Sequence, residues 1–240
     1  DCCEAVGSRV NGYPVGTFGD IGTFSFYPAH QITAGGGGGM IVTDDDWIAR
    51  NCKSLRDWGK CWDWNDKVGD TKTDYRESVD GMEYYRGYTY QTVGYNMKLP
   101  EMNAAFGRVQ LKKLDRFSKV RLENYNYLKS KLSEIEEFIQ VESLPNATPS
   151  WFGYILTLRE ERLNRNRLGD WLESQGIRTR PFFAGNITRH TPFKYLFGDF
   201  PVADKLMKDS LFVGVGPWLG QPELDYMADT IIEWVKCQKN

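Results

Sequence analysis

Five consecutive glycines at residues 35–39 constrain the local fold more than any other feature of this sequence. Just before them, in residues 22–27, aromatic and polar side chains alternate, which predicts a β-strand with two different faces. Pro28 ends that strand, and an unbroken glycine run loses too much backbone entropy to form a regular element. We therefore expect a strand, a tight glycine loop, and a short buried strand at residues 40–42.

The composition is that of a globular protein and argues against several classes of function. Of 240 residues, 41% are hydrophobic and 26% are charged, and the formal net charge is −2. A charge this small argues against a nucleic-acid or anionic-membrane partner. The sequence has no run of about 18 apolar residues that would cross a membrane, and it opens without the basic and apolar stretches of a signal peptide. Five cysteines, an odd number, favour reduced thiols, so we expect a cytoplasmic protein.

Periodic patterns in the rest of the chain predict helices alternating with strands, which indicates α/β or α+β layering. Asp44 or Asp45 is expected to cap a helix that ends near Trp58, and Asn164 to cap a later one. Residues 60–92 have no clear period and are interpreted as an irregular functional segment or an interface. Further helices are expected at 100–111, 122–135, 164–176 and 223–235, and strands at 138–141, 152–158 and 179–183.

The last helix is predicted to bury one face, because apolar side chains recur there at helical spacing. These side chains are Leu224, Met227, Ile231 and Trp234. A boundary between a larger and a smaller domain is expected between the two middle helical patterns. We assign residues 1–112 to the large domain and 113–240 to the small one.

Few side chains stand out as chemically reactive. His30 comes just after the predicted strand and before the glycine loop, where α/β enzymes place reactive groups and bind phosphates. His190 lies in a polar loop, and an ordinary hydrogen-bonded histidine is favoured there. Arg178 and Arg180 would face the same side of an extended segment and suit a phosphate or carboxylate, although an exposed charged face is the default interpretation. Three tryptophans could stack on a sugar or simply pack a loop: Trp58, Trp62 and Trp64.

Several short motifs occur in an order that resembles one enzyme family. They are Asp-Cys-Cys-Glu-Ala-Val-Gly at 1–7, Gly-Thr-Phe-Gly-Asp at 16–20, Ser-Phe-Tyr-Pro-Ala-His at 25–30, Gly-Tyr-Asn at 94–96, Ser-Trp-Phe-Gly at 150–153 and Phe-Ala-Gly-Asn at 183–186. Together they resemble the DegT/DnrJ/StrS sugar aminotransferases, which are fold-type I pyridoxal-phosphate (PLP) enzymes. The nearest branch is that of the CDP-4-keto-6-deoxyglucose 3-dehydrases. The resemblance implies an α/β fold: the C-terminal portion of the large domain followed by a small α+β domain.

The resemblance also implies roles for individual residues. Asp1 corresponds to the carboxylate that pairs with the cofactor's pyridinium nitrogen, and Glu4 is a weaker candidate for contact with the ring. Ser25 corresponds to a hydroxyl that binds the cofactor phosphate. Asn96 corresponds to an amide that reaches the phosphate from a neighbouring subunit, which implies a homodimer. Tyr27 and Arg180 are candidates for contact with the substrate.

His30 occupies the position at which aminotransferases of this family have lysine. Lysine bonds covalently to the cofactor, whereas imidazole cannot, although it can transfer a proton near neutral pH. The resemblance therefore implies that pyridoxamine 5′-phosphate (PMP), interconverting with PLP, is held non-covalently. It implies 3-dehydration of a nucleotide-linked 4-keto-6-deoxyhexose for deoxysugar and lipopolysaccharide synthesis, with His30 as the base.

Two positions depart from the family pattern. Cys3 and Cys61 match two of the four cysteines of the iron–sulfur dehydrases, but Asp63 and Thr71 stand where the other two are expected. We therefore do not expect an iron–sulfur cluster. Gly36 stands where the family commonly has glutamate, which affects the loop that follows His30.

Other interpretations remain open. Because the sequence opens without an element before the Asp1 motif, we expect an N-terminally truncated chain, and an inactive truncated homologue is one alternative. Another is a PLP-dependent aminotransferase that uses a different lysine, with Lys53 and Lys60 as candidates by default. The sequence does not identify the nucleotide or the sugar, and it leaves room for a reductase partner.

Overall fold

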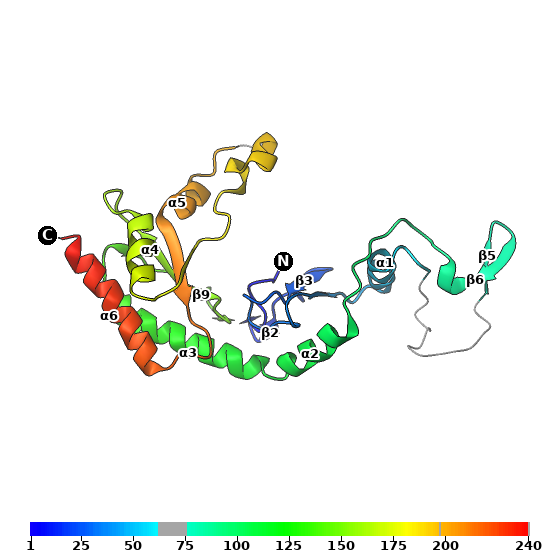
Figure 1. Ribbon diagram of the computed structural model, residues 1–240, viewed down its shortest axis with the longest axis horizontal. Helices are drawn as coiled ribbons and strands as arrows, with labels where there is room; N and C mark the ends of the chain where they lie inside the picture. The colour runs from blue at the N-terminus through cyan, green and yellow to red at the C-terminus, as the bar shows by residue number, and fades with distance from the viewer. Residues whose placement is uncertain (62–75, 197, 240) are drawn as a thin grey trace. The chain divides into compact units, whose positions relative to one another are not determined.

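The computed structural model describes residues 1–61, 76–196 and 198–239 (Figure 1). Contacts between Cα atoms divide the chain into two compact units. The first unit contains Asp1–Cys3 and Val15–Leu111, and the second contains Glu4–Pro14 and Lys112–Asn240. The assignment of residues 1–112 and 113–240 to two domains stays a prediction. In the described part of the chain, no helix is both long and apolar enough to cross a membrane.

The first unit is built from two hairpins and two helices. Strand β3 pairs antiparallel with β4, and β5 pairs antiparallel with β6. The elements are β3 (Gly22–Ser25), β4 (Gly39–Val42), α1 (Asp46–Arg56), β5 (Arg76–Val79), β6 (Met82–Tyr85), a 3-10 turn (Arg86–Tyr88) and α2 (Glu101–Leu111). The predicted strand and glycine loop are confirmed, with β3 ending three residues before Pro28.

The expected burial of the strand at residues 40–42 is wrong. Met40 is 44% exposed and Ile41 is 51% exposed, and β4 belongs to a two-stranded sheet with β3. An apolar run predicts a strand from local preference alone. Whether anything covers that strand depends on contacts with other parts of the chain, and the described residues leave these side chains open.

Helix α1 begins as predicted. The Asp45 side chain accepts a hydrogen bond from the backbone N–H of Ile48 at 2.9 Å, which caps the first turn. The helix ends at Arg56 because the backbone then turns left-handed, with a φ of 60° at Trp58 and 85° at Gly59. Adding a side chain at Gly59 would place its Cβ 1.8 Å from the carbonyl oxygen of Thr92, so glycine is required there.

The expectation that residues 60–92 are irregular is wrong for their second half. Strands β5 and β6 form a tight hairpin whose turn residues Asp80 and Gly81 have φ values of 50° and 79°. Asp-Gly is a strong signal for such a turn, but this hairpin was not among the predicted elements. The expectations for Trp62, Asp63, Trp64 and Thr71 lie outside the described residues.

The second unit contains a four-stranded antiparallel sheet with the strand order β10-β11-β9-β7. Helices α3 and α6 run beside each other in this unit, shown in green and red in Figure 1. Three very short strands form a separate sheet with the order β2-β1-β8. The sheet strands are β7 (Phe138–Ile139), β9 (Gly153–Leu158), β10 (Thr179–Pro181) and β11 (Ser210–Gly214), and the short strands are β1 (Arg9–Val10), β2 (Tyr13–Pro14) and β8 (Ala147–Thr148). The helices are α3 (Leu114–Leu132), α4 (Arg165–Ser174), α5 (Pro201–Asp209) and α6 (Gln221–Cys237), with 3-10 turns at Ile187–Arg189 and Thr191–Leu196.

A continuous apolar core holds the second unit together. It joins the sheet to α3, α4 and α6, and includes Leu128, Leu156, Leu168 and Val213, all fully buried. The predicted inner face of α6 is confirmed, since its four apolar side chains are all buried. The Asn164 cap of α4 is also confirmed. Neither α5 nor β11 was among the predicted elements.

Candidate active site

The segment from Ser25 to His30 forms a strand end followed at once by a tight turn. Ser25 lies opposite Gly39 in the β3–β4 pair, and its hydroxyl accepts a hydrogen bond from the N–H of Tyr27 at 3.2 Å. The N–H of His30 then donates to the carbonyl of Tyr27 at 3.0 Å, which closes the turn. These backbone bonds place the predicted phosphate-binding hydroxyl and the imidazole on one short, ordered segment.

The His30 ring lies edge-on to the Tyr27 ring, with the two centroids 6.2 Å apart and an angle of 69° between the ring planes. His30 is half-buried, whereas Tyr27 is 59% exposed. The next two residues, Gln31 and Ile32, are buried. The half-buried imidazole therefore lies between the exposed Tyr27 ring and a buried stretch of the chain.

The glycine loop is tied to helix α2 by Asn103. Its side-chain amide donates to the carbonyls of Ala34 at 2.7 Å and Gly35 at 3.3 Å. Gly36 has a φ of 112°, a backbone conformation that side chains other than glycine rarely adopt. A glutamate at this position, as is common in the family, would be strained. The replacement of that glutamate by Gly36 therefore goes together with a loop conformation that only glycine adopts easily.

Asp1 lies beside β3, on which Ser25 is located. Its carboxylate accepts from the N–H of Cys3 at 3.1 Å and, at the longer distance of 3.4 Å, from the Thr23 hydroxyl. Thr23 and Ser25 point to the same face of β3 and are about 7 Å apart along the strand. A carboxylate and a hydroxyl thus mark two points along one side of a single strand.

This donor set fits a flat pyridine ring that carries a phosphate. Asp1 offers a carboxylate for a protonated ring nitrogen, and Ser25 offers a hydroxyl for the phosphate. Among the described residues, no group of three or more His, Cys, Asp or Glu side chains is arranged to hold a metal ion.

The other predicted site residues lie elsewhere. Asn96 is exposed and forms an isolated β-bridge with Asp57, just beyond the end of α1. Glu4 and Arg180 belong to the second unit, whereas the other predicted site residues belong to the first. Arg180 donates to the carbonyl of Thr179 at 2.7 Å. With Arg178 it lines a cavity of about 640 Å³.

The residues of the competing interpretations have ordinary surroundings. The ammonium group of Lys60 lies 4.9 Å from the centre of the Trp58 ring, and Lys53 is in the last turn of α1. The Nε2 atom of His190 donates to the carbonyl of Ala184 at 2.9 Å. That contact agrees with the interpretation of His190 as a hydrogen-bonded loop residue.

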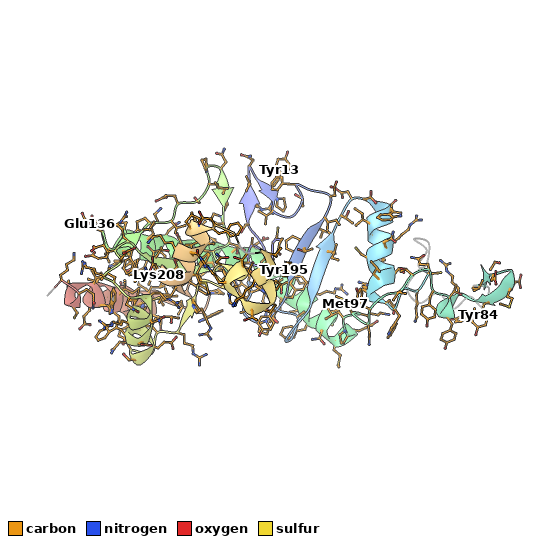
Figure 2. The ribbon with its side chains drawn as sticks, turned by 90° about the horizontal axis from the view of Figure 1, so that it is seen from above. Tyr13, Tyr84, Met97, Glu136, Tyr195 and Lys208 are labelled. Atoms are coloured by element: carbon orange, nitrogen blue, oxygen red, sulfur yellow. The ribbon has the colours of Figure 1, made fainter. Side chains whose placement is uncertain are left out.

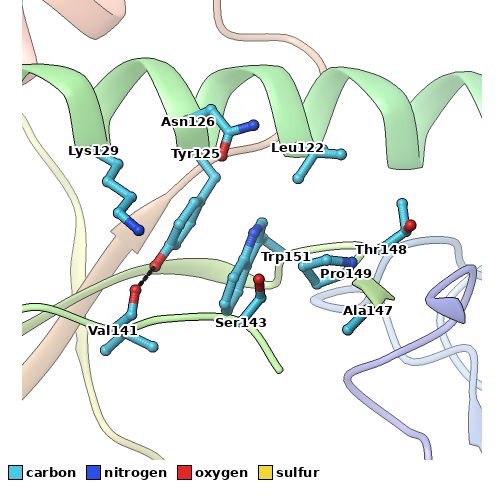
Figure 3. A pocket seen from close by; sticks show the side chains of 10 residues that line it. All are labelled: Leu122, Tyr125, Asn126, Lys129, Val141, Ser143, Ala147, Thr148, Pro149 and Trp151. Carbon is cyan, nitrogen blue, oxygen red and sulfur yellow. Dashed lines mark hydrogen bonds between the residues drawn. The ribbon is translucent and has the colours of Figure 1, made fainter. Parts of the chain in front are cut away.

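A smaller cavity of about 190 Å³ lies in the second unit beside α3 (Figure 3). The rings of Tyr125 and Trp151 are stacked there, 3.9 Å apart and nearly parallel. The Tyr125 hydroxyl donates to the carbonyl of Val141 at 3.3 Å. Burial, reinforced by the negative charge of neighbouring groups, raises the pKa of Tyr125 above its ordinary value. The stack is best explained as packing between α3 and the segments that follow it.

Comparison with known proteins identifies the family. The family model described as the DegT/DnrJ/EryC1/StrS aminotransferase family matches residues 1–232. The chain belongs to this family. One relative is the lipopolysaccharide biosynthesis protein RfbH of Salmonella typhimurium, 37% identical over 98% of this chain and 55% of its own length. Another is the dTDP-4-dehydro-2,6-dideoxy-D-glucose 3-dehydratase of Saccharopolyspora spinosa, 38% identical over 98% of this chain and 52% of its own length.

Solved structures establish the fold. The Escherichia coli GDP-4-keto-6-deoxy-D-mannose 3-dehydratase, solved with bound hydrated PLP, superimposes with a TM-score of 0.82 and 31% identity. That match covers 96% of this chain and 59% of the E. coli chain. The chain therefore has the fold of PLP-dependent aminotransferases, as predicted, and it spans about half the length of the curated relatives that it matches.

Proposed function

We propose that this protein is a 3-dehydratase of a nucleotide-linked 4-keto-6-deoxyhexose, acting with PMP/PLP in deoxysugar synthesis for lipopolysaccharide. The observation that carries the proposal is His30, which stands at the family's lysine position at the end of the Ser25–His30 turn. The names of the Saccharopolyspora and E. coli relatives, both 3-dehydratases, support it. So does the lipopolysaccharide role in the name of the Salmonella relative.

The residues of β3 and its turn would hold the cofactor. Asp1 would bind the protonated ring nitrogen, and Ser25 would bind the phosphate together with Asn96 of a second copy of the chain. When bound, PMP supplies an amine that bonds to the sugar ketone and a ring that takes up electrons. The assignment of Asn96 makes the site depend on a homodimer, which is part of the proposal.

His30 would transfer the proton. Imidazole accepts and returns a proton near neutral pH, and the turn fixes His30 beside Tyr27, whose exposed ring can contact the sugar. Glu4 and Arg180 are the proposed contacts from the second unit, to the ring and the substrate respectively. The 3-hydroxyl leaves as water in this scheme.

The test replaces His30 with asparagine in the protein expressed from its natural gene. H30N should lower turnover of a CDP-, GDP- or dTDP-linked 4-keto-6-deoxyhexose by about 10²- to 10⁴-fold, the usual contribution of a general base. Binding of PMP, followed by absorbance, should persist. The matched control is H190Q, which changes the other histidine and keeps an amide donor for the Ala184 carbonyl. Full turnover by H30N would remove His30 as the base.

A nucleotide-sugar aminotransferase is the second candidate function. Its support is a GDP-perosamine synthase from Vibrio cholerae, 32% identical over 76% of this chain. The mass of the product separates the two reactions, since a dehydratase removes the 3-hydroxyl and an aminotransferase replaces the ketone oxygen with an amine. An aminotransferase that used Lys53 or Lys60 would also form a PLP adduct on that lysine, which borohydride reduction would trap.

A further inference from the structure

A third cavity, of about 260 Å³ and within the second unit, is walled mainly by aromatic rings. Phe152, Phe183 and Phe212 contact one another with ring centroids 5.5 Å apart, and Phe182 lies 5.4 Å from Phe183. Four phenylalanine rings thus form one continuous apolar wall. Pockets that enclose a drug-sized ligand measure roughly 300–1,000 Å³, so this cavity suits a single small ring.

Phe183 lies in the wall with its backbone in an unfavourable conformation. Its φ is 48°, a left-handed conformation that is rare for a bulky side chain, and its ring is still 50% exposed. The following turn is held by Gly185, where an added Cβ would come within 2.4 Å of Met207. Such strain persists where the surroundings enforce it, and it concentrates at ligand-binding sites.

A few polar side chains also line the cavity. Glu4 supplies the one ionisable group among the described residues that line it, and Ser8 and Ser150 lie beside it. Ser150 is fixed by a hydrogen bond from its N–H to the Ser8 hydroxyl at 2.8 Å. Glu4 is also three residues along the chain from Asp1, the proposed partner of the cofactor ring. A cavity lined by aromatic rings and one carboxylate suits a ligand with an apolar face and hydroxyl groups.

We propose that this cavity binds the sugar ring of the substrate and selects for a methyl group at C6. The inference rests on the proposed function. The phenylalanine wall packs against the C5–C6 side of a 6-deoxyhexose. The Glu4 carboxylate, besides its proposed contact with the cofactor ring, accepts a hydrogen bond from a sugar hydroxyl. A hydroxymethyl group in place of the methyl group would bury a hydroxyl against four rings without a partner. Hydrophobic pockets discriminate against such a change by up to about 100-fold.

The test uses the protein expressed from its natural gene and two variants of one residue. F183L removes part of the wall. F183G removes the whole ring while suiting the backbone, because glycine adopts a φ of 48° without strain. Both should raise KM for the keto sugar by about 10-fold or more with little change in kcat, since the lost contact is made equally in the ground and transition states. F193L is the control, because Phe193 is in the same unit and does not line the cavity.

A second measurement reads binding without turnover. In saturation-transfer NMR with the methyl glycoside of a 6-deoxyhexose, the C6 methyl protons should receive saturation from the wild type and lose it in F183G. If turnover is absent but this signal behaves as expected, the proposed reaction fails and the cavity assignment stands. If turnover is present but F183G matches F193L in KM and in methyl saturation, the cavity assignment is overturned and the reaction stands. An absence of methyl saturation in the wild type also overturns it.

Discussion

In the second unit the apolar side chains of a sheet and three helices enclose one another, whereas in the first unit the described apolar side chains mostly face outward. Leu128, Leu156 and Leu168 of the second unit are fully buried, while in the first unit only Ile32 and Ala34 are buried apolar residues among those described. Tyr84 and Met97 of the first unit, both labelled in Figure 2, are 57% and 69% exposed. The proposed base, His30, lies in the unit with the smaller core.

This difference shows two ways of fixing a functional segment. The turn that contains His30 is held by backbone hydrogen bonds, and the glycine loop after it is held by the Asn103 amide and by close glycine contacts. The wall that contains Phe183 is held by ring packing in a unit with a closed core. Large exposed apolar surfaces usually mark sites of interaction, which agrees with the proposed homodimer.

The sharpest test of the comparison is the same substitution made in each unit. L156A should lower the free energy of unfolding of the second unit by about 3 kcal/mol, because it leaves a cavity in a closed core. L111A in the first unit should cost about 0.5 kcal/mol or less, because Leu111 is 49% exposed. Amide hydrogen exchange reports each unit separately. Equal costs would show that the two units do not differ in this way.

A smaller effect should appear at high pH. Burial first, and the negative charge of Glu142 second, raises the pKa of Tyr154 to about 12, and burial also raises that of Tyr125. An unfolded tyrosine ionises near pH 10, so this stabilising contribution is complete below about pH 10 and is lost as the pH rises towards the folded pKa values.

Urea unfolding between about pH 8 and 11 checks this expectation. The double variant Y125F/Y154F should lose less stability with rising pH than the wild type. At neutral pH its free energy of unfolding should be lower than that of the wild type by about 1 kcal/mol, because the hydrogen bond from Tyr125 to the Val141 carbonyl is lost. The control is Y195F, since Tyr195 is 80% exposed. If the unfolding free energy of the wild type and of the double variant fell equally with rising pH, water would reach both hydroxyls.

The smallest effect is expected at the surface of the second unit, where the contrast with the first unit is weakest. Hydrogen bonds from Arg189 and Asn186 lower the pKa of Asp204 to about 2. Its contribution to stability is complete above the unfolded pKa of about 4 and is lost as the pH falls to about 2. The difference in unfolding free energy between wild type and D204N should therefore shrink over that range. A difference that stays constant down to pH 2 would contradict the pairing.

Features coded by neighbouring residues could be predicted from the sequence, and those that depend on distant contacts could not. The caps at Asp45 and Asn164 and the inner face of α6 follow local patterns, and they are confirmed. The exposure of β4 could not be predicted, because an apolar run does not reveal what covers it. The Asp80–Gly81 hairpin was predictable but missed.

The candidate site shows the same division. The order of the motifs was enough to predict the family and the fold. The place of His30 between a strand and a glycine loop made it a candidate, and the comparison with the family's lysine gave it a specific role. The link from Asp1 to Thr23 spans 22 residues, and that from Asn103 to Ala34 spans 69. No local pattern indicates either of them. The roles of the individual site residues stay predictions.

The five glycines at residues 35–39 differ in how much space surrounds them, and this difference identifies a position for a probe. Gly38 and Gly39 are confined, because an added Cβ would meet Ala34 at 3.2 Å or the carbonyl of Phe24 at 2.7 Å. Gly35 and Gly36 have positive φ values, but Gly37 has neither a positive φ nor any atom within 4 Å of an added Cβ. A fluorescent amino acid substituted for Gly37 would therefore be tolerated, and its emission would report on binding near His30, seven residues away.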